Sequence, residues 1–255
     1  MPHFNSEGLD LFYVDMPPIG RNLNEPVLLI HGFASNHIVN WVNTLWVKVL
    51  GESGRRVIAL DNRGHGASAK PHDPIAYHTD RMANDARNLL HHLGIERADV
   101  MGYSMGARIT AFLAQAHPHL VRSAVLGGLG YHLVEGGGLP QSIVEAMTAP
   151  SLADVTDPMG RMFRRFAEST GSDLTALAAC IAGSRQNLAP ELASQVQCPV
   201  LVAVGTKDAI AGDADRLARL LPHGRALDIP GRDHNLAVGD KVYKAGVLAF
   251  LDERP

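Results

Sequence analysis

Short aliphatic runs that recur along this chain, each followed by Gly, Asp or His, constrain its fold more than any other feature. Between them lie stretches whose apolar residues recur at helical spacing. Continuous apolar runs of this length are typical of strands buried on both faces of a parallel sheet, and the helical stretches suit crossover connections. The alternation predicts an α/β protein with a mainly parallel, doubly wound sheet. The runs are residues 26–30, 56–60, 99–101, 123–126 and 200–204, and the helical stretches are 39–50, 79–93, 105–117 and 213–221.

Two parts of the chain depart from this rhythm. Residues 9–14 alternate loosely in polarity and are expected to form, with the residues before them, an antiparallel hairpin at the sheet edge. From residue 131 to 190 no strand is evident, and glycines and prolines separate short helical stretches. We therefore predict a small helical cap at 131–190, inserted into a core domain of residues 1–130 and 191–255. A few surface helices packed on one edge of the sheet are the alternative.

Composition excludes several classes of function. The 255 residues, 46% hydrophobic and 19% charged, suit one globular core, and a net charge of −3 provides no basic surface for nucleic acid. No apolar run approaches the roughly 18 residues of a membrane span, and the first residues lack the features of a secretion signal, so we expect a cytoplasmic protein without membrane partners. Neither the thirteen histidines nor Cys180 and Cys198 follow a metal-binding spacing, so no metal is expected and both thiols are expected to be buried.

The segment Gly102-Tyr103-Ser104-Met105-Gly106 follows the strand predicted at 99–101 and opens the next helix. Nucleophilic attack at neutral pH needs a hydroxyl that a base activates and that the substrate can reach. A Gly-x-Ser-x-Gly sequence between a strand and a helix places its serine on a sharp, exposed turn, the nucleophile elbow. The same residues could instead form a glycine-rich turn in which Ser104 caps the helix. The strand before and the helix after favour Ser104 as a catalytic nucleophile.

His234 is the candidate base for this nucleophile. It lies after a strand predicted at 226–229 and before the last helix, predicted at 241–251, and this places it at the carboxyl edge of the sheet, where ligands bind. His65 and His223 are competitors. His223 follows a proline at a predicted helix end, where a capping or cationic role is simpler.

A carboxylate near the end of an intervening strand is needed to orient the imidazole and stabilise the imidazolium. Asp208 follows the run at 200–204 and gives the order Ser104, Asp208, His234, which is the order expected for a nucleophile elbow. Other carboxylates suit other roles, as helix caps, as a strand residue or as a neighbour too close to the base in sequence: Asp213, Asp215, Asp228 and Asp233.

A tetrahedral intermediate also needs hydrogen-bond donors for its oxyanion. The backbone N–H groups of Met105, directly after the nucleophile, and of Phe33, in the loop after the first parallel strand, are placed to supply them. His31 is expected to support this loop through a side-chain hydrogen bond at most. The Gly and Asp residues of segment 61–66 suit a sharp turn after a strand rather than catalysis.

Five segments together resemble the successive signatures of the α/β-hydrolase superfamily, and they span nearly the whole chain except the predicted cap. Within the superfamily the sequence is similar to small bacterial carboxylesterases and to 3-oxoadipate enol-lactonase-like hydrolases. The resemblance implies the α/β-hydrolase fold, a Ser-His-Asp triad without a cofactor, and a substrate cleft between sheet and cap. The segments are residues 31–33, 61–66, 102–106, 205–208 and 231–234.

The cleft is expected to be lined partly by cap side chains, most of which form the cap's own small core, and partly by neighbours of the nucleophile and of the oxyanion loop. Trp41 and Trp46 are instead expected to pack in the core or at its edge. Because no strongly basic or acidic cluster marks the cap, we expect a small, largely uncharged substrate. The expected substrate-binding residues are Gly32, Tyr103, Tyr131, Met162, Phe163 and Phe166.

These residues predict a serine hydrolase that cleaves a carboxylic ester through an acyl-enzyme, as a monomer or homodimer. Lactone opening, hydrolysis of a carbon–carbon bond and perhydrolysis would use the same triad, and only the pocket distinguishes them. Ser104 argues against epoxide opening and halide removal, for which superfamily relatives use a carboxylate nucleophile. A non-catalytic, ligand-binding member of the fold is a further alternative, because a fold alone does not establish a function.

Overall fold

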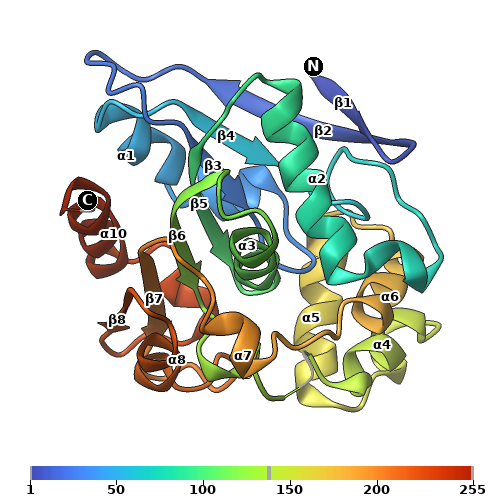
Figure 1. The fold of residues 1–255 in the computed structure, drawn as a ribbon. Helices are drawn as coiled ribbons and strands as arrows, with labels where there is room; N and C mark the ends of the chain where they lie inside the picture. The colour runs from blue at the N-terminus through green and yellow to red at the C-terminus, as the bar shows by residue number, and fades with distance from the viewer. Residues whose placement is uncertain (1, 137–138, 254–255) are drawn as a thin grey trace.

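The computed structural model describes residues 2–136 and 139–253, and within them the central feature is an eight-stranded sheet in the order β1-β2-β4-β3-β5-β6-β7-β8 (Figure 1). Strands β3 to β8 run parallel to one another. Strands β1 and β2 form the antiparallel edge hairpin, and β2 pairs antiparallel with β4. The predicted mainly parallel, doubly wound α/β sheet is confirmed. The strands are β1 His3–Ser6, β2 Leu9–Met16, β3 Val27–Ile30, β4 Val57–Leu60, β5 Ala98–Tyr103, β6 Val121–Gly127, β7 Val200–Gly205 and β8 Gly224–Ile229.

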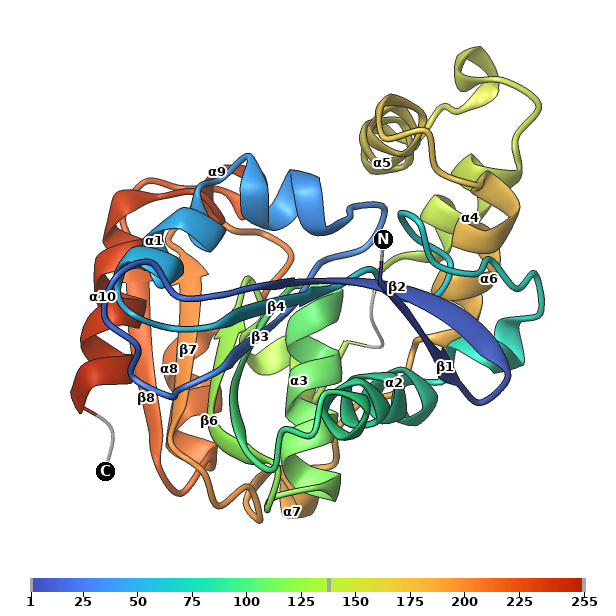
Figure 2. The same ribbon diagram turned by 90° about the horizontal axis from the view of Figure 1, so that it is seen from above.

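Helices cover both faces of the sheet, which explains why its central strands are apolar throughout. Successive side chains of a strand point to opposite faces, so Leu28 and Ile30 of β3 pack into one apolar cluster while Val27 and Leu29 pack into the other. Helices α2 (Thr79–His92), α3 (Met105–Ala116) and α8 (Ala214–Leu220) contribute to the first cluster. Helices α1 (Trp46–Glu52) and α10 (Lys241–Glu253) contribute to the second, and Figure 2 shows α1 and α10 on one side of the strands with α2 and α3 on the other.

One of the predicted helices is not continuous in the structure. The stretch predicted at 39–50 is divided into a π-helical turn, η1 (Ile38–Val42), and α1, with Leu45 between them in the left-handed region at φ 68°. Trp41 and Trp46 are both fully buried. In one straight helix, two residues five positions apart would point about 140° away from each other. The break therefore lets both indole rings enter the core.

Between β6 and β7 the chain forms η3 (Tyr131–Leu133), α4 (Gln141–Thr148), η4 (Leu152–Asp154), α5 (Pro158–Ser169), α6 (Leu174–Gly183) and α7 (Pro190–Ala193). Gly137 and Gly138, within the predicted cap, lie outside the described residues. Asp157 and Asp173 cap α5 and α6 by accepting backbone N–H bonds from Gly160 and Ala176, as acidic N-caps commonly do. Figures 1 and 2 show α4, α5 and α6 grouped beside the sheet.

Helix α5 packs over the loop that follows β3. The rings of Phe163 and Phe33 have centroids 5.9 Å apart, and Thr170, directly after α5, donates a hydrogen bond from Oγ1 to the Ala34 carbonyl at 3.1 Å. The inserted helices therefore border the sheet at the carboxyl end of β3. Over residues 2–136 and 139–253, none of the helices combines the length and the apolar character needed to cross a membrane.

Candidate active site

Ser104 lies in the turn between β5 and α3 with φ 54° and ψ −113°. Positive φ is unfavourable for a residue with a side chain, so close packing must hold this conformation. A Cβ on Gly102 would lie 2.1 Å from the Gly106 carbonyl oxygen, and a Cβ on Gly106 would lie 1.9 Å from the Ile30 carbonyl oxygen. Only glycine fits at these two positions. The turn that carries Ser104 is therefore packed directly against the end of β3.

His234 bridges two of the other predicted site residues. Its Nε2 lies 3.0 Å from Ser104 Oγ, and its Nδ1 lies 2.7 Å from Asp208 Oδ2. The Asp208 side chain is fully buried, and its Oδ1 accepts backbone N–H bonds from Ile210 at 2.8 Å and Ala211 at 3.1 Å. A carboxylate fixed in this way favours a proton on Nδ1 and leaves Nε2 free to accept the proton of the serine hydroxyl. The fold thus brings Ser104, Asp208 and His234 together from three separate turns.

The local structure around His234 fixes its backbone. His234 begins the short helix α9 (His234–Ala237), whose N-cap, Asp233, accepts N–H bonds from Asn235 and Leu236. The Tyr103 hydroxyl donates a 2.6 Å hydrogen bond to the His234 carbonyl. Asp233 is therefore a helix cap and does not orient the imidazole.

The other candidates for the acid and the base have other positions in the structure. Asp213 is the N-cap of α8, whereas Asp215 lies in the first turn of that helix and is not its cap, which corrects the expectation for Asp215. Asp228 lies within β8, as predicted, and His223 is exposed just before that strand. His65 is fully buried, burial and the neighbouring His31 lower its pKa to about 3, and its Nδ1–H donates to the Arg63 carbonyl.

The loop after β3 is held by hydrogen bonds on both sides of Gly32. The Gly32 N–H donates to Asn40 Oδ1 at 3.0 Å, and the Gly32 carbonyl accepts from His31 Nδ1 at 2.7 Å. The next backbone N–H, that of Phe33, has no acceptor among the described residues, and neither has the N–H of Met105. Two backbone donors that flank Ser104 in the fold are therefore available to a ligand.

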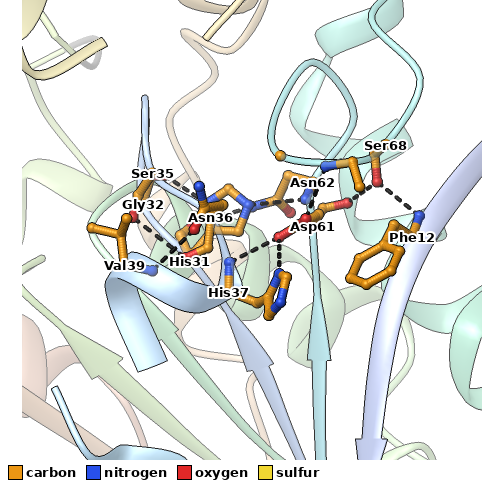
Figure 3. Close-up of polar contacts among 12 residues, drawn as sticks. Phe12, His31, Gly32, Ser35, Asn36, His37, Val39, Asp61, Asn62 and Ser68 are labelled. Carbon is orange, nitrogen blue, oxygen red and sulfur yellow. Dashed lines mark hydrogen bonds and ion pairs between the residues drawn. The ribbon is translucent and has the colours of Figure 1, made fainter. Parts of the chain in front are cut away.

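Figure 3 shows how the end of β4 supports this loop. The Asn62 N–H donates to His31 Nε2 at 3.0 Å, while Asp61 Oδ1 accepts from the backbone N–H and the Nδ1–H of His37 at 2.8 and 2.9 Å. Burial would raise the pKa of Asp61, but the His37 hydrogen bond, the nearby His31 and the N–H of Ala67 outweigh burial and lower the pKa to about 2. The expectation that segment 61–66 is structural agrees with these contacts.

Comparison with known proteins bears on the fold. The family model described as the α/β hydrolase fold matches residues 25–135. The chain has the α/β-hydrolase fold. It is 33% identical over 253 residues to the dihydrolipoyllysine-residue acetyltransferase component of an acetoin cleaving system from Pseudomonas putida, across 91% of this chain and 65% of that protein. The chain thus spans less than two thirds of that relative.

Two further proteins match over nearly their whole length. A 2-(acetamidomethylene)succinate hydrolase from Mesorhizobium japonicum is 27% identical over 280 residues, which cover 98% of this chain and 96% of that protein. The crystal structure of the enol-lactonase from Burkholderia xenovorans LB400 has a TM-score of 0.78 at 22% identity and covers 99% of this chain and 100% of that one. At this identity the structural likeness establishes the α/β-hydrolase fold alone.

Two cavities meet at Ser104. The larger has a volume of about 890 Å³, lies between the sheet and α5, and is lined by both Ser104 and His234. The smaller has a volume of about 60 Å³ and is lined by Ser104, Phe33, Met105 and Arg108 among others, but not by His234. A reacting group bound at Ser104 can therefore extend in two directions.

Most of the predicted substrate-binding residues line the larger cavity, namely Gly32, Tyr103, Met162, Phe163 and Phe166, together with Phe33. The sixth predicted residue, Tyr131, lines neither cavity. Its ring lies under the Arg216 guanidinium, whose carbon is 3.5 Å from the ring centroid, and its N–H donates to the Asp213 carbonyl. Tyr131 thus anchors the chain against α8.

The sequence did not predict the cationic residues that line the two cavities. Arg161 and Arg165 of α5 line the larger cavity, and Arg108 of α3 lines the smaller one. The position of Arg108 four residues after Ser104 was a usable signal, because such residues share one helix face. Among the described residues no group of three His, Cys, Asp or Glu side chains could hold a metal ion. Cys180 and Cys198 are free and buried, as expected.

Proposed function

We propose that this protein is a serine hydrolase that cleaves carboxylic esters, with Ser104 as the nucleophile, His234 as the general base and Asp208 as the residue that orients His234. One observation carries the proposal. His234 spans from a buried carboxylate at 2.7 Å to the Ser104 hydroxyl at 3.0 Å, which are the contacts that a general base and its orienting group require.

In the first step, Ser104 Oγ bonds to the ester carbonyl carbon as its proton passes to His234 Nε2. The imidazolium that forms is stabilised by Asp208, whose Oδ2 accepts from Nδ1. The Phe33 and Met105 N–H groups would donate to the oxyanion of the tetrahedral intermediate. Preorganised donors of this kind typically contribute about 10²- to 10³-fold in rate each.

In the second step, His234 returns the proton to the alcohol oxygen as the carbon–oxygen bond breaks, and an acyl-Ser104 ester remains. Water then enters, His234 takes its proton, and attack on the acyl carbon releases the acid and restores Ser104. The alcohol must therefore leave on the side of His234, which is the larger cavity. We propose that residues 131–190 act as a cap, since Met162, Phe163 and Phe166 of α5 line that cavity.

The Mesorhizobium relative that matches along nearly its whole length is a hydrolase, which supports hydrolysis over group transfer for this chain. Lactone opening would use the same residues and the same steps, with both products joined in one molecule. A cytoplasmic location and a monomeric or homodimeric state remain predictions from the sequence alone.

The proposal is tested by labelling the protein with a fluorophosphonate and mapping the modified peptide. We expect the adduct on Ser104, no adduct in Ser104→Ala, and strongly reduced labelling in His234→Ala. The same preparations should be assayed with p-nitrophenyl esters from acetate to octanoate, on which the unaltered protein alone is expected to turn over. An adduct on another residue, or equal turnover by Ser104→Ala, would refute the assignment.

A further inference from the structure

Arg108 is a buried cation without an acidic partner. It follows Ser104 by one turn of α3, is 5% exposed, and makes no ion pair among the described residues. Arginine is rarely buried unless its charge is paired. Burial lowers its pKa to about 10, so the guanidinium remains charged at neutral pH. Its acceptors are uncharged oxygens, the carbonyls of His132 at 2.7 Å, Gln186 at 2.7 Å and Leu133 at 3.3 Å, and Asn187 Oδ1 at 3.4 Å.

These hydrogen bonds do not use all the N–H donors of the guanidinium. Of its five N–H donors, the Nε–H and one hydrogen on Nη2 have no acceptor among residues 2–136 and 139–253. Arg108 lines the cavity of about 60 Å³ that also reaches Ser104 and Met105. His132 and Ser184 are its other polar lining residues beside Ser104, and its described lining includes no Asp or Glu. The cavity thus offers donors and positive charge without a compensating anion.

The smaller cavity lies on the acyl side of the site under the proposed mechanism. His234, which must protonate the leaving alcohol, lines the larger cavity and not the smaller one. The smaller cavity is lined by Phe33 and Met105, whose N–H groups face the oxyanion in the proposed mechanism. A volume of about 60 Å³ admits only a few atoms, which is enough for a short acyl chain.

We propose that the substrate carries a carboxylate on its acyl part and that Arg108 binds this carboxylate in the smaller cavity. This inference rests on the proposed ester hydrolysis. Residues four apart on a helix are separated by about 6 Å along its axis, which suits a carboxylate two or three carbons from the scissile carbonyl. The substrate class is therefore a monoester of a short dicarboxylic acid.

The charge of the larger cavity agrees with an anionic substrate. Arg161 and Arg165 line it, and no Asp or Glu is among its described lining residues. This inference departs from the expectation of a largely uncharged substrate, because Arg108 lies outside residues 131–190 and Arg161 and Arg165 of α5 line one cavity.

The test compares two esters that differ chiefly in charge. Ethyl hydrogen succinate carries a carboxylate where ethyl 4-oxopentanoate carries a methyl ketone of similar shape, and both release ethanol. We expect kcat/KM, measured by ethanol release, to be about 10- to 100-fold higher for the succinate ester, because a charged hydrogen bond is lost with the ketone.

Two arginine variants make the test specific to Arg108. Arg108→Met should abolish the preference for the succinate ester, and Arg108→Lys should retain part of it. Arg164→Met is the matched control, since Arg164 is also 5% exposed and donates to two carbonyls but lines neither cavity. It should keep the preference. Thermal unfolding shows whether each variant folds.

The possible failures are distinguishable. Equal rates on the two ethyl esters, or an unchanged preference in folded Arg108→Met, overturn the role of Arg108 and leave ester hydrolysis standing. If Arg108→Met does not fold, the role of Arg108 is decided by the ratio of kcat/KM for the two ethyl esters, measured in the unaltered protein and in Arg108→Lys. If the fluorophosphonate labels Ser104 but the protein hydrolyses neither ester, this inference is also overturned. Absence of labelling at Ser104 overturns the proposed function instead.

Discussion

Replacing Asp61 with asparagine should remove a defined part of the pH dependence of stability. The carboxylate is 1% exposed and accepts hydrogen bonds from His37 and Ala67. Its pKa is about 2 in the folded protein against an ordinary value of 3.8. Because the folded pKa is the lower one, the ionised group stabilises the protein fully above pH 3.8, and this stabilisation is lost as pH falls toward 2.

The size of the effect follows from the two pKa values. At about 1.4 kcal/mol per pKa unit, the carboxylate contributes roughly 2 kcal/mol at neutral pH, and roughly 1 kcal/mol of this is lost between pH 6 and pH 3. Asp61→Asn cannot titrate. The free energy of unfolding of the unaltered protein should therefore exceed that of the variant by about 1 kcal/mol more at pH 6 than at pH 3.

Urea unfolding followed by circular dichroism at pH 6 and pH 3 measures this difference. Ser68→Ala is the control, because Ser68 Oγ hydrogen bonds to the Asp61 carbonyl and the Phe12 N–H in the same network but carries no ionisable group. Its destabilisation should be equal at both pH values. The reasoning would be refuted if the free energies of unfolding of Asp61→Asn and of the unaltered protein differed by the same amount at both pH values.

Two further predictions concern the contact between Asp208 and His234 and the turn that carries Ser104. Asp208→Asn should lower kcat by about 10³- to 10⁴-fold with little change in KM, because an amide favours the wrong His234 tautomer; initial rates on p-nitrophenyl esters measure this, and a loss below tenfold would contradict it. Gly106→Ala should destabilise the protein by about 3 kcal/mol, because its Cβ would lie 1.9 Å from the Ile30 carbonyl oxygen. Gly94→Ala, where a Cβ meets nothing within 4 Å, should cost about 1 kcal/mol by urea unfolding, and equal losses would contradict the steric argument.

The sheet and the meeting of Ser104, Asp208 and His234 could be predicted because each depends on local sequence. A buried aliphatic run identifies a parallel strand, and the carboxyl ends of such strands lie at one edge of the sheet. Residues that follow these runs are therefore neighbours in space whatever their separation in sequence. The antiparallel edge hairpin was predictable for a similar reason, since alternation within residues 9–14 is local.

Other features depend on contacts that no local pattern records. The break at Leu45 arises because both tryptophans are buried against residues distant in sequence, including Val238, whose carbonyl accepts the Trp46 Nε1–H. Tyr131 faces α8 because of Arg216, which lies 85 positions later in the chain. The unpaired charge of Arg108 depends on which oxygens reach it from residues 132–133 and 186–187.

The packing of Gly106 against the Ile30 carbonyl has a consequence for how this protein could diversify. The turn bearing Ser104 and the loop bearing Phe33 are joined through backbone contacts of the sheet, so neither can move without the other. Helix α5, by contrast, belongs to a separate segment of the chain, and its side chains line the larger cavity. Under the proposed function, exchanges of side chains within Pro158–Ser169 would change the alcohols that the larger cavity accepts, while Ser104, His234 and Phe33 keep their spacing.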